Sequence, residues 1–189
     1  MRANSNSRKS MFYIRNLTYI AISVALLCVS AWITIPGTVP FTLQTFAVFL
    51  ILGLLGAKNG LFAILIYILL GIIGLPVFAS FKGGIGVILG PTGGYILGFI
   101  FSAFIYYIFS LFIKNENVLY IFGSLLGLLG CYFLGTIWFY YIYSDTNTIS
   151  LSYILMVCVI PFIIPDILKI IISFIVLKNI KKRTKYSLK

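Results

Sequence analysis

Asp166 and Lys169 lie inside the last strongly apolar stretch of the sequence and are the side chains best placed to do chemistry. A charge at bilayer depth costs roughly 2.5–3.5 kcal/mol on insertion scales, so such residues usually face a cavity and mark a functional site. An ionised aspartate only accepts hydrogen bonds, whereas a lysine only donates them. Their spacing of three places them on one helix face, about one turn apart. Together they can therefore bind one polar ligand.

The surrounding segment, residues 161–169, reads Pro-Phe-Ile-Ile-Pro-Asp-Ile-Leu-Lys. Proline suits the first turn of a helix, so we expect a helix to begin near Pro165. Asp166 would then lie near the positive helix end, which lowers the cost of its charge. An alternative interpretation is an ion pair that only holds helices together. We favour a ligand, because burying such a pair seldom stabilises a protein more than apolar packing does.

Catalytic chemistry finds little support in the rest of the sequence. There is no histidine, and the other carboxylates, Glu116 and Asp145, fall in expected loops. The glycine-rich run 83–90 misses the dinucleotide fingerprint, and no GxxxxGK[ST] motif occurs. The cysteines lack metal-ligand spacing and are interpreted as small core residues: Cys28, Cys131 and Cys158. We expect no catalytic residue, no metal and no cofactor bound by this chain.

The elements that position the charged pair are expected to be membrane-spanning helices. Hydrophobic residues make up 61% of the chain and charged residues only 9%, with a mean hydropathy of +1.13, which is typical of an integral membrane protein. At about 20 apolar residues per crossing, six or seven spans fill the chain. We predict a single all-α transmembrane domain, residues 1–189, with six helices. The expected spans are 12–35, 43–56, 59–74, 93–113, 118–143 and 151–178.

The second and third spans are short and meet at residues 56–60, Gly-Ala-Lys-Asn-Gly, which predicts a helical hairpin. The first span follows a basic leader, 1–11, and is too long for a signal-peptide core, so it is expected to be retained. We expect both termini, including the basic tail 179–189, to be cytoplasmic. Twelve of the fourteen basic residues then lie on the cytoplasmic side, and the exceptions are Lys82 and Lys169. The net charge of +11 then reflects topology and attraction to lipid headgroups, and nucleic-acid binding is not expected.

Two connections on the expected outer side, 35–45 and 74–95, are rich in proline, glycine and hydrogen-bonding side chains. Non-helical backbone at membrane depth is tolerated only where it is buried in protein or lines a cavity. We therefore expect these loops to enclose the open end of a cavity that reaches Asp166. A pair of ordinary turns is the alternative interpretation.

Four motifs carry a resemblance to a known family. They are Pro-x-x-Val-Pro-Phe-Thr-Leu-Gln-Thr at 36–45, Gly-Leu-Pro-Val-Phe at 74–78, Gly-Pro-Thr-Gly-Gly-Tyr at 90–95, and the segment 161–169. In this order the chain resembles, over roughly residues 12–180, the biotin-specific substrate-binding subunit (S component) of energy-coupling-factor transporters. The resemblance implies a six-helix S-component fold in a prokaryotic plasma membrane and capture of biotin from outside. It also implies a transmembrane coupling subunit and two ATPase subunits that use ATP as partners.

Biotin offers two ureido N–H donors, a polarised carbonyl, an apolar bicyclic ring and a carboxylate tail. Asp166 suits the ureido N–H groups, and Lys169 suits a carbonyl or carboxylate. Lys82 is a further candidate, to attract the carboxylate of the ligand. Trp138 is another, to pack against its bicyclic ring. The expected substrate-binding residues are Asp166, Lys169, Gln44, Tyr95, Thr42, Phe41, Phe78 and Ser80.

The first span contains Ala21 and Ala25, a small-xxx-small pair that lets another helix approach closely. In S components such a pair is the docking stripe for the coupling subunit, and the resemblance carries that role to these alanines. Packing within the chain is the alternative, because glycines repeat the same spacing elsewhere. Other function hypotheses are an S component for another small vitamin or biotin precursor, a membrane enzyme using Asp166 and Lys169 as an acid–base pair, and a structural assembly subunit.

Overall fold

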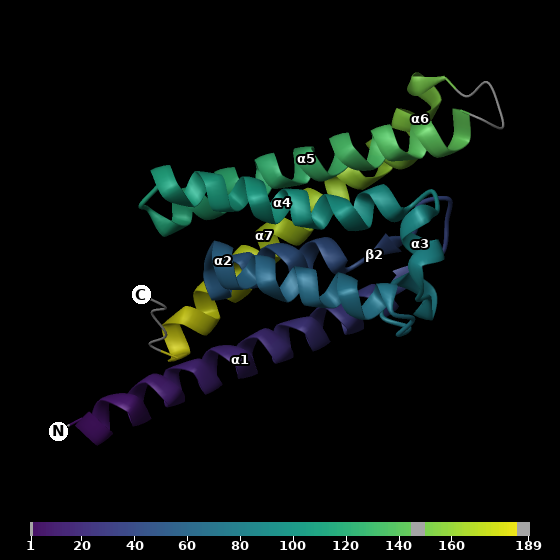
Figure 1. Cartoon of the computed structure of the whole chain (residues 1–189). Helices are drawn as coiled ribbons and strands as arrows, with labels where there is room; N and C mark the ends of the chain where they lie inside the picture. Colours follow the sequence, from purple (N-terminus) through teal and green to yellow (C-terminus); the bar gives the residue numbers. More distant parts are fainter. Residues whose placement is uncertain (1, 145–149, 185–189) are drawn as a thin grey trace.

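The computed structural model describes residues 2–144 and 150–184, which form a bundle of long helices with one short β-hairpin (Figure 1). Asp145, Met1 and the end of the basic tail, 185–189, lie outside the described residues. In chain order the elements are α1 (Arg2–Trp32), β1 (Thr34–Ile35), β2 (Phe41–Thr42), α2 (Gln44–Ile72), η1 (Ala79–Phe81), α3 (Ile85–Leu89), α4 (Gly93–Phe112), α5 (Glu116–Ser144), α6 (Leu151–Cys158) and α7 (Ile160–Thr184).

Five helical segments among the described residues are long and apolar enough to cross a membrane. They are Tyr13–Trp32, Gln44–Ile72, Gly93–Phe112, Glu116–Tyr143 and Leu151–Arg183. Their outward faces are apolar as well, as Phe112 (78% exposed) and Ile164 (72% exposed) illustrate. A helix that is apolar all round belongs in lipid or in a large core. The prediction of a helical membrane protein is confirmed, while the number of crossings and the side on which the termini lie remain predictions.

The second candidate span, α2, contains a reversal of the chain. Gly56 has φ 75° and ψ 168°, which is not helical. A Cβ built on Gly60 would lie 3.2 Å from the Cα of Leu52, although residues eight apart in a continuous helix are separated by about 12 Å. The two limbs of α2 therefore run back along each other, as the hairpin predicted for residues 56–60 requires (Figure 1).

Helices α4 and α5 are antiparallel and pack closely through small residues. A Cβ on Gly98 would lie 2.7 Å from the sulfur of Cys131, so only glycine fits there. Ser102 Oγ bridges the two helices, 2.8 Å from the carbonyl oxygen of Gly98 and 2.7 Å from that of Gly127. Close approach through small residues and cross-helix hydrogen bonds is a common way to join helices in membranes.

The stretch predicted as one span, 151–178, is two helices in the structure. Val159, with φ −123° and ψ −58°, separates α6 from α7. The prediction that Pro165 lies in the first turn is wrong, because α7 begins at Ile160 and Pro165 is inside the helix. Asp166 is the seventh residue of α7, beyond the first turn in which the helix dipole acts most strongly. Its charge must therefore be stabilised by other groups.

The connections that follow α1 and α2 lie at the same end of the bundle. In Figure 1 the start of α1 and the end of α7 lie at one end, whereas β2, α3 and α6 lie at the other. Both loops that the sequence analysis singled out belong to this second end. They therefore converge on one entrance.

Candidate functional site

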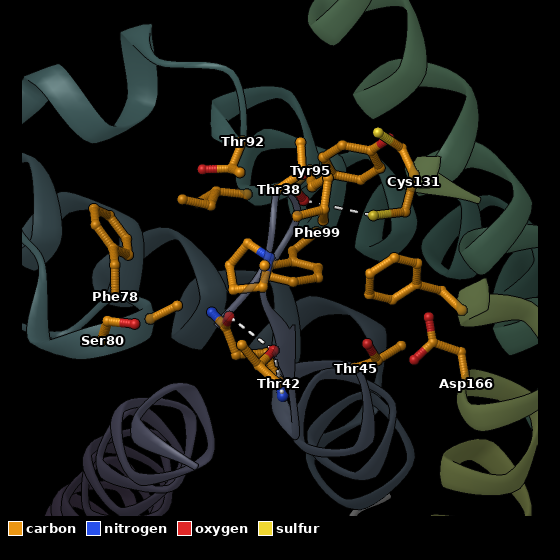
Figure 2. A pocket seen from close by; sticks show the side chains of 18 of the residues that line it. Thr38, Thr42, Thr45, Phe78, Ser80, Thr92, Tyr95, Phe99, Cys131 and Asp166 are labelled. Atoms are coloured by element: carbon orange, nitrogen blue, oxygen red, sulfur yellow. Dashed lines mark hydrogen bonds between the residues drawn. The ribbon is translucent and has the colours of Figure 1, made fainter. Parts of the chain in front are cut away.

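A cavity of about 220 Å³ lies beneath these loops (Figure 2). This is somewhat smaller than the roughly 300–1,000 Å³ of pockets for drug-sized ligands, so it suits a compact molecule. Its wall comes from the first loop, the second loop and helices α4 to α7. The lining residues are Pro36, Gly37, Thr38, Val39, Pro40, Thr42, Gln44, Thr45, Phe78, Ala79, Ser80, Lys82, Val87, Thr92, Tyr95, Ile96, Phe99, Leu128, Cys131, Tyr132, Cys158, Phe162, Asp166 and Lys169.

Asp166 and Lys169 are both buried, 4% and 6% exposed, and both line this cavity. Lys169 Nζ donates a hydrogen bond to Asp166 Oδ1 at 2.7 Å, and Tyr132 Oη donates to Asp166 Oδ2 at 2.7 Å. Each carboxylate oxygen thus has one donor from the protein and keeps a lone pair for another. The carboxylate is held in place and can still accept hydrogen bonds from a ligand.

The ion pair that the sequence analysis weighed as an alternative is therefore present, with its members in the cavity wall. Lys169 Nζ also lies 3.9 Å from the ring centroid of Phe41, a cation–π contact that helps to stabilise its charge. Burying a charge is tolerable only where such partners exist. An ammonium has three donors, so Lys169 retains capacity for a ligand oxygen.

Gln44 and Thr42 line the cavity and are joined in one hydrogen-bond chain. Thr42 Oγ1 donates to Gln44 Oε1 at 3.1 Å, and Gln44 Nε2 donates to Tyr67 Oη at 2.7 Å. Tyr67 Oη then donates to the carbonyl oxygen of Val77 at 3.0 Å. The chain ties the first loop to the second limb of α2 and to the second loop. Gln44 keeps one amide N–H beyond these contacts.

The predicted aromatic contacts divide into those in the wall and those behind it. Phe78 lines the cavity, is 1% exposed and packs edge-on against Tyr67 with ring centroids 5.6 Å apart. Phe41 is not among the lining residues. It stacks instead on Phe162, which does line the cavity. Trp138 is also outside the lining set, and its indole N–H donates to the carbonyl oxygen of Gly90 at 3.0 Å. The structure thus places Phe41 and Trp138 in a supporting layer.

Ser80 and Lys82 reach the cavity from a strained turn. Ser80 (φ 57°) and Phe81 (φ 59°) both have left-handed backbone, which costs about 1–2 kcal/mol for each non-glycine residue. Trp32 at the end of α1 holds this turn. Its indole N–H donates to the carbonyl oxygen of Pro76 at 2.8 Å, and its ring stacks on Phe81 with centroids 5.1 Å apart.

Tyr95, on α4, lines the cavity with its ring packed over Gly135, where a Cβ would lie 2.3 Å from the ring. Its hydroxyl oxygen is buried and has no hydrogen-bond partner among the described residues. The polar side chains beside this hydroxyl are those of Thr136 and Cys158. Figure 2 shows Tyr95 and Asp166 reaching the cavity from different helices.

Sequence reasoning missed Tyr132, the second partner of Asp166. No motif surrounds it, and only the packing of α5 against α7 brings it to the carboxylate. Cys131 and Cys158 are buried, as expected for core residues, and they also line the cavity. Ala21 and Ala25 are both exposed on α1 within the described bundle, so internal packing does not occupy their face.

The helical membrane fold and a cavity with a charged pair at its wall define a membrane protein that binds a small polar ligand. Residues 2–186 match the model of the BioY family, and the chain belongs to that family. It is 42% identical over 172 residues to the biotin transporter BioY of Thermotoga maritima, covering 89% of this chain and 97% of that protein. It is 39% identical over 171 residues to the probable biotin transporter BioY of Pyrococcus horikoshii, covering 90% and 98%.

A solved structure is similar as well. The crystal structure of the S component for biotin from an ECF-type ABC transporter superposes with a TM-score of 0.76 at 28% sequence identity. The match covers 90% of this chain and 92% of that one. The resemblance that the four sequence motifs carried is therefore confirmed.

Proposed function

We propose that this chain is the biotin-binding S component of an ECF-type vitamin uptake transporter. The observation that carries the proposal is the buried Asp166–Lys169 pair in a cavity of about 220 Å³, in a chain of the BioY family. The names of its relatives support biotin as the ligand. The protein acts as a binding subunit and not as an enzyme, and it binds no cofactor of its own.

The chemistry of the cavity matches the two polar ends of biotin. Asp166, with both oxygens fixed by the protein, accepts a hydrogen bond from a ureido N–H group. Lys169 donates to the ureido carbonyl or to the carboxylate. Phe78 and the other apolar parts of the wall pack against the bicyclic ring, and Tyr95, Gln44, Thr42 and Ser80 supply further hydrogen bonds.

The proposed topology has six crossings, with α2 counted as two short spans and both termini in the cytoplasm. The clustering of basic residues supports this orientation, since Lys and Arg near span ends stay inside. Biotin then enters from outside through the loop end of the bundle. In the plasma membrane of a prokaryote, a coupling subunit docks on Ala21 and Ala25. Two ATPase subunits use the ATP that drives inward release.

A direct test is ligand-dependent stability of the detergent-purified chain. Biotin should raise the unfolding temperature in proportion to the logarithm of its concentration above Kd, because it binds only the folded state. A panel of other vitamins and biotin precursors, at equal concentration, should give smaller shifts. Stabilisation by another member of the panel, with none by biotin, would assign a different ligand to the same fold.

A further inference from the structure

Polar contacts join α5 and α7 at three levels along their length. Tyr132 contacts Asp166 nearest the cavity, and the hydroxyl of Tyr120 hydrogen-bonds Ser173 further along. At the far end Lys181 Nζ lies 2.8 Å from Glu116 Oε2. On α5, Glu116 and Tyr120 are one turn apart, whereas Tyr132 lies about 120° further around the helix at roughly 100° per residue. The contact of Tyr132 with α7 is therefore separate from the other two and lies next to the cavity.

Of these three contacts, the one between Tyr132 and Asp166 is the one that involves the ligand-binding pair. Tyr132 is 9% exposed and lines the cavity, whereas Tyr120 is 1% exposed and is not among the lining residues. The phenol of Tyr132 donates a hydrogen bond to Asp166 Oδ2, and Lys169 donates one to Oδ1. The two donors contact different oxygens of the carboxylate and come from different helices, so together they fix its rotation.

Rotation of this carboxylate matters for recognition. The χ2 torsion of aspartate has a broad, two-fold preference, so packing and hydrogen bonds have to select its angle. Without the phenol, no described residue donates to Oδ2, and Lys169 alone among them holds the carboxylate. Both oxygens can then turn toward the ammonium and away from the ligand. The two ureido N–H groups of biotin flank its carbonyl and point apart, so the carboxylate accepts from one of them and needs an oxygen held at a fixed angle.

We propose that Tyr132 is a positioning residue that fixes the angle of Asp166 and makes the site selective for a ligand with a ureido N–H donor. This assignment rests on the proposed function and adds a determinant of its specificity. The hydroxyl of Tyr132 acts through Asp166. Hydrogen bonds to charged groups are stronger than those between neutral groups. Loss of this one corresponds to a change in ligand affinity of about ten- to a hundredfold.

The test compares Tyr132→Phe with Tyr120→Phe in the full-length chain, purified in detergent. The control removes a phenol hydroxyl from the same helix, also hydrogen-bonded to α7, but without contact to the pair. Each variant is titrated with biotin and with an analogue methylated on both ureido nitrogens, and its unfolding temperature is measured separately.

Tyr132→Phe should lose biotin affinity about ten- to a hundredfold and should lose much of the preference for biotin over the methylated analogue. Tyr120→Phe should keep both the affinity and the preference. Equal losses in the two variants, or unchanged biotin binding in Tyr132→Phe, would overturn the assignment. Equal loss for both ligands in Tyr132→Phe would do the same. Failure of the unsubstituted chain to bind biotin would instead overturn the proposed function, and this assignment with it.

Discussion

Gly71 is the position at which one methyl group should disturb the cavity wall most clearly. A Cβ there would lie 2.0 Å from the ring of Phe78, which is 1% exposed and packed against Tyr67. The new methyl group and the ring cannot both fit, so Gly71→Ala must push the ring toward the cavity or toward the hydrogen-bond chain of Tyr67 and Gln44. Overpacking of this kind costs about 1–3 kcal/mol.

For a chain of this length, a loss of 1 kcal/mol lowers the unfolding temperature by about 2–4 °C. We therefore expect Gly71→Ala to unfold roughly 2–12 °C lower and to bind biotin more weakly, because Phe78 lines the cavity. The assay is thermal unfolding of the detergent-purified protein by intrinsic fluorescence, with and without biotin.

Gly86→Ala is a matched control, since a Cβ at Gly86 meets nothing within 4 Å and its φ is not positive. This variant should unfold within about 1 °C of the unsubstituted chain or slightly above it. If Gly71→Ala unfolds at the same temperature as Gly86→Ala and binds biotin normally, then Phe78 is not locked in place and the reasoning fails.

Two further substitutions test how the loops and the hairpin are held. Trp32→Phe keeps the stacking on Phe81 but removes the hydrogen bond to Pro76, so the strained turn should open more often and biotin should dissociate several-fold faster in a stopped-flow chase. An unchanged dissociation rate would show that the turn is held without Trp32. Gly56→Ala places a side chain in backbone that is essentially restricted to glycine, at a cost on the order of 1–3 kcal/mol, although nothing lies within 4 Å of the new Cβ. It should lower the unfolding temperature and leave biotin affinity unchanged, and normal stability would contradict the observed angles.

The sequence was most informative where residue type alone constrains structure. A charged pair in an apolar stretch predicted a buried site, and both members line the cavity. The Gly-Ala-Lys-Asn-Gly run predicted a reversal, which occurs at Gly56. These features follow from the cost of charge in lipid and from the backbone freedom of glycine.

Sequence reasoning failed where packing between helices decides the outcome. A first turn was predicted at Pro165, but Pro161 occupies that turn instead, because the break at Val159 lets α7 begin at Ile160. Tyr132 reaches Asp166 only through the register of α5 against α7, which no local pattern records. Likewise, Phe41 contacts Lys169 from behind the cavity wall. Residue type alone does not tell an aromatic side chain behind the wall from one that lines it.

The measurement that tests the central claim most directly is equilibrium binding of biotin to Asp166→Asn, with Glu116→Gln as the control. Both variants replace an ion-paired carboxylate by an amide, but Glu116 lies in an exposed pair away from the biotin cavity. The unsubstituted chain and Glu116→Gln should bind biotin alike, because exposed pairs contribute only about 0–1 kcal/mol. Asp166→Asn should bind at least about a hundredfold more weakly, since it loses charge-assisted hydrogen bonds to the ligand. Biotin affinity in Asp166→Asn equal to that of Glu116→Gln would contradict the account.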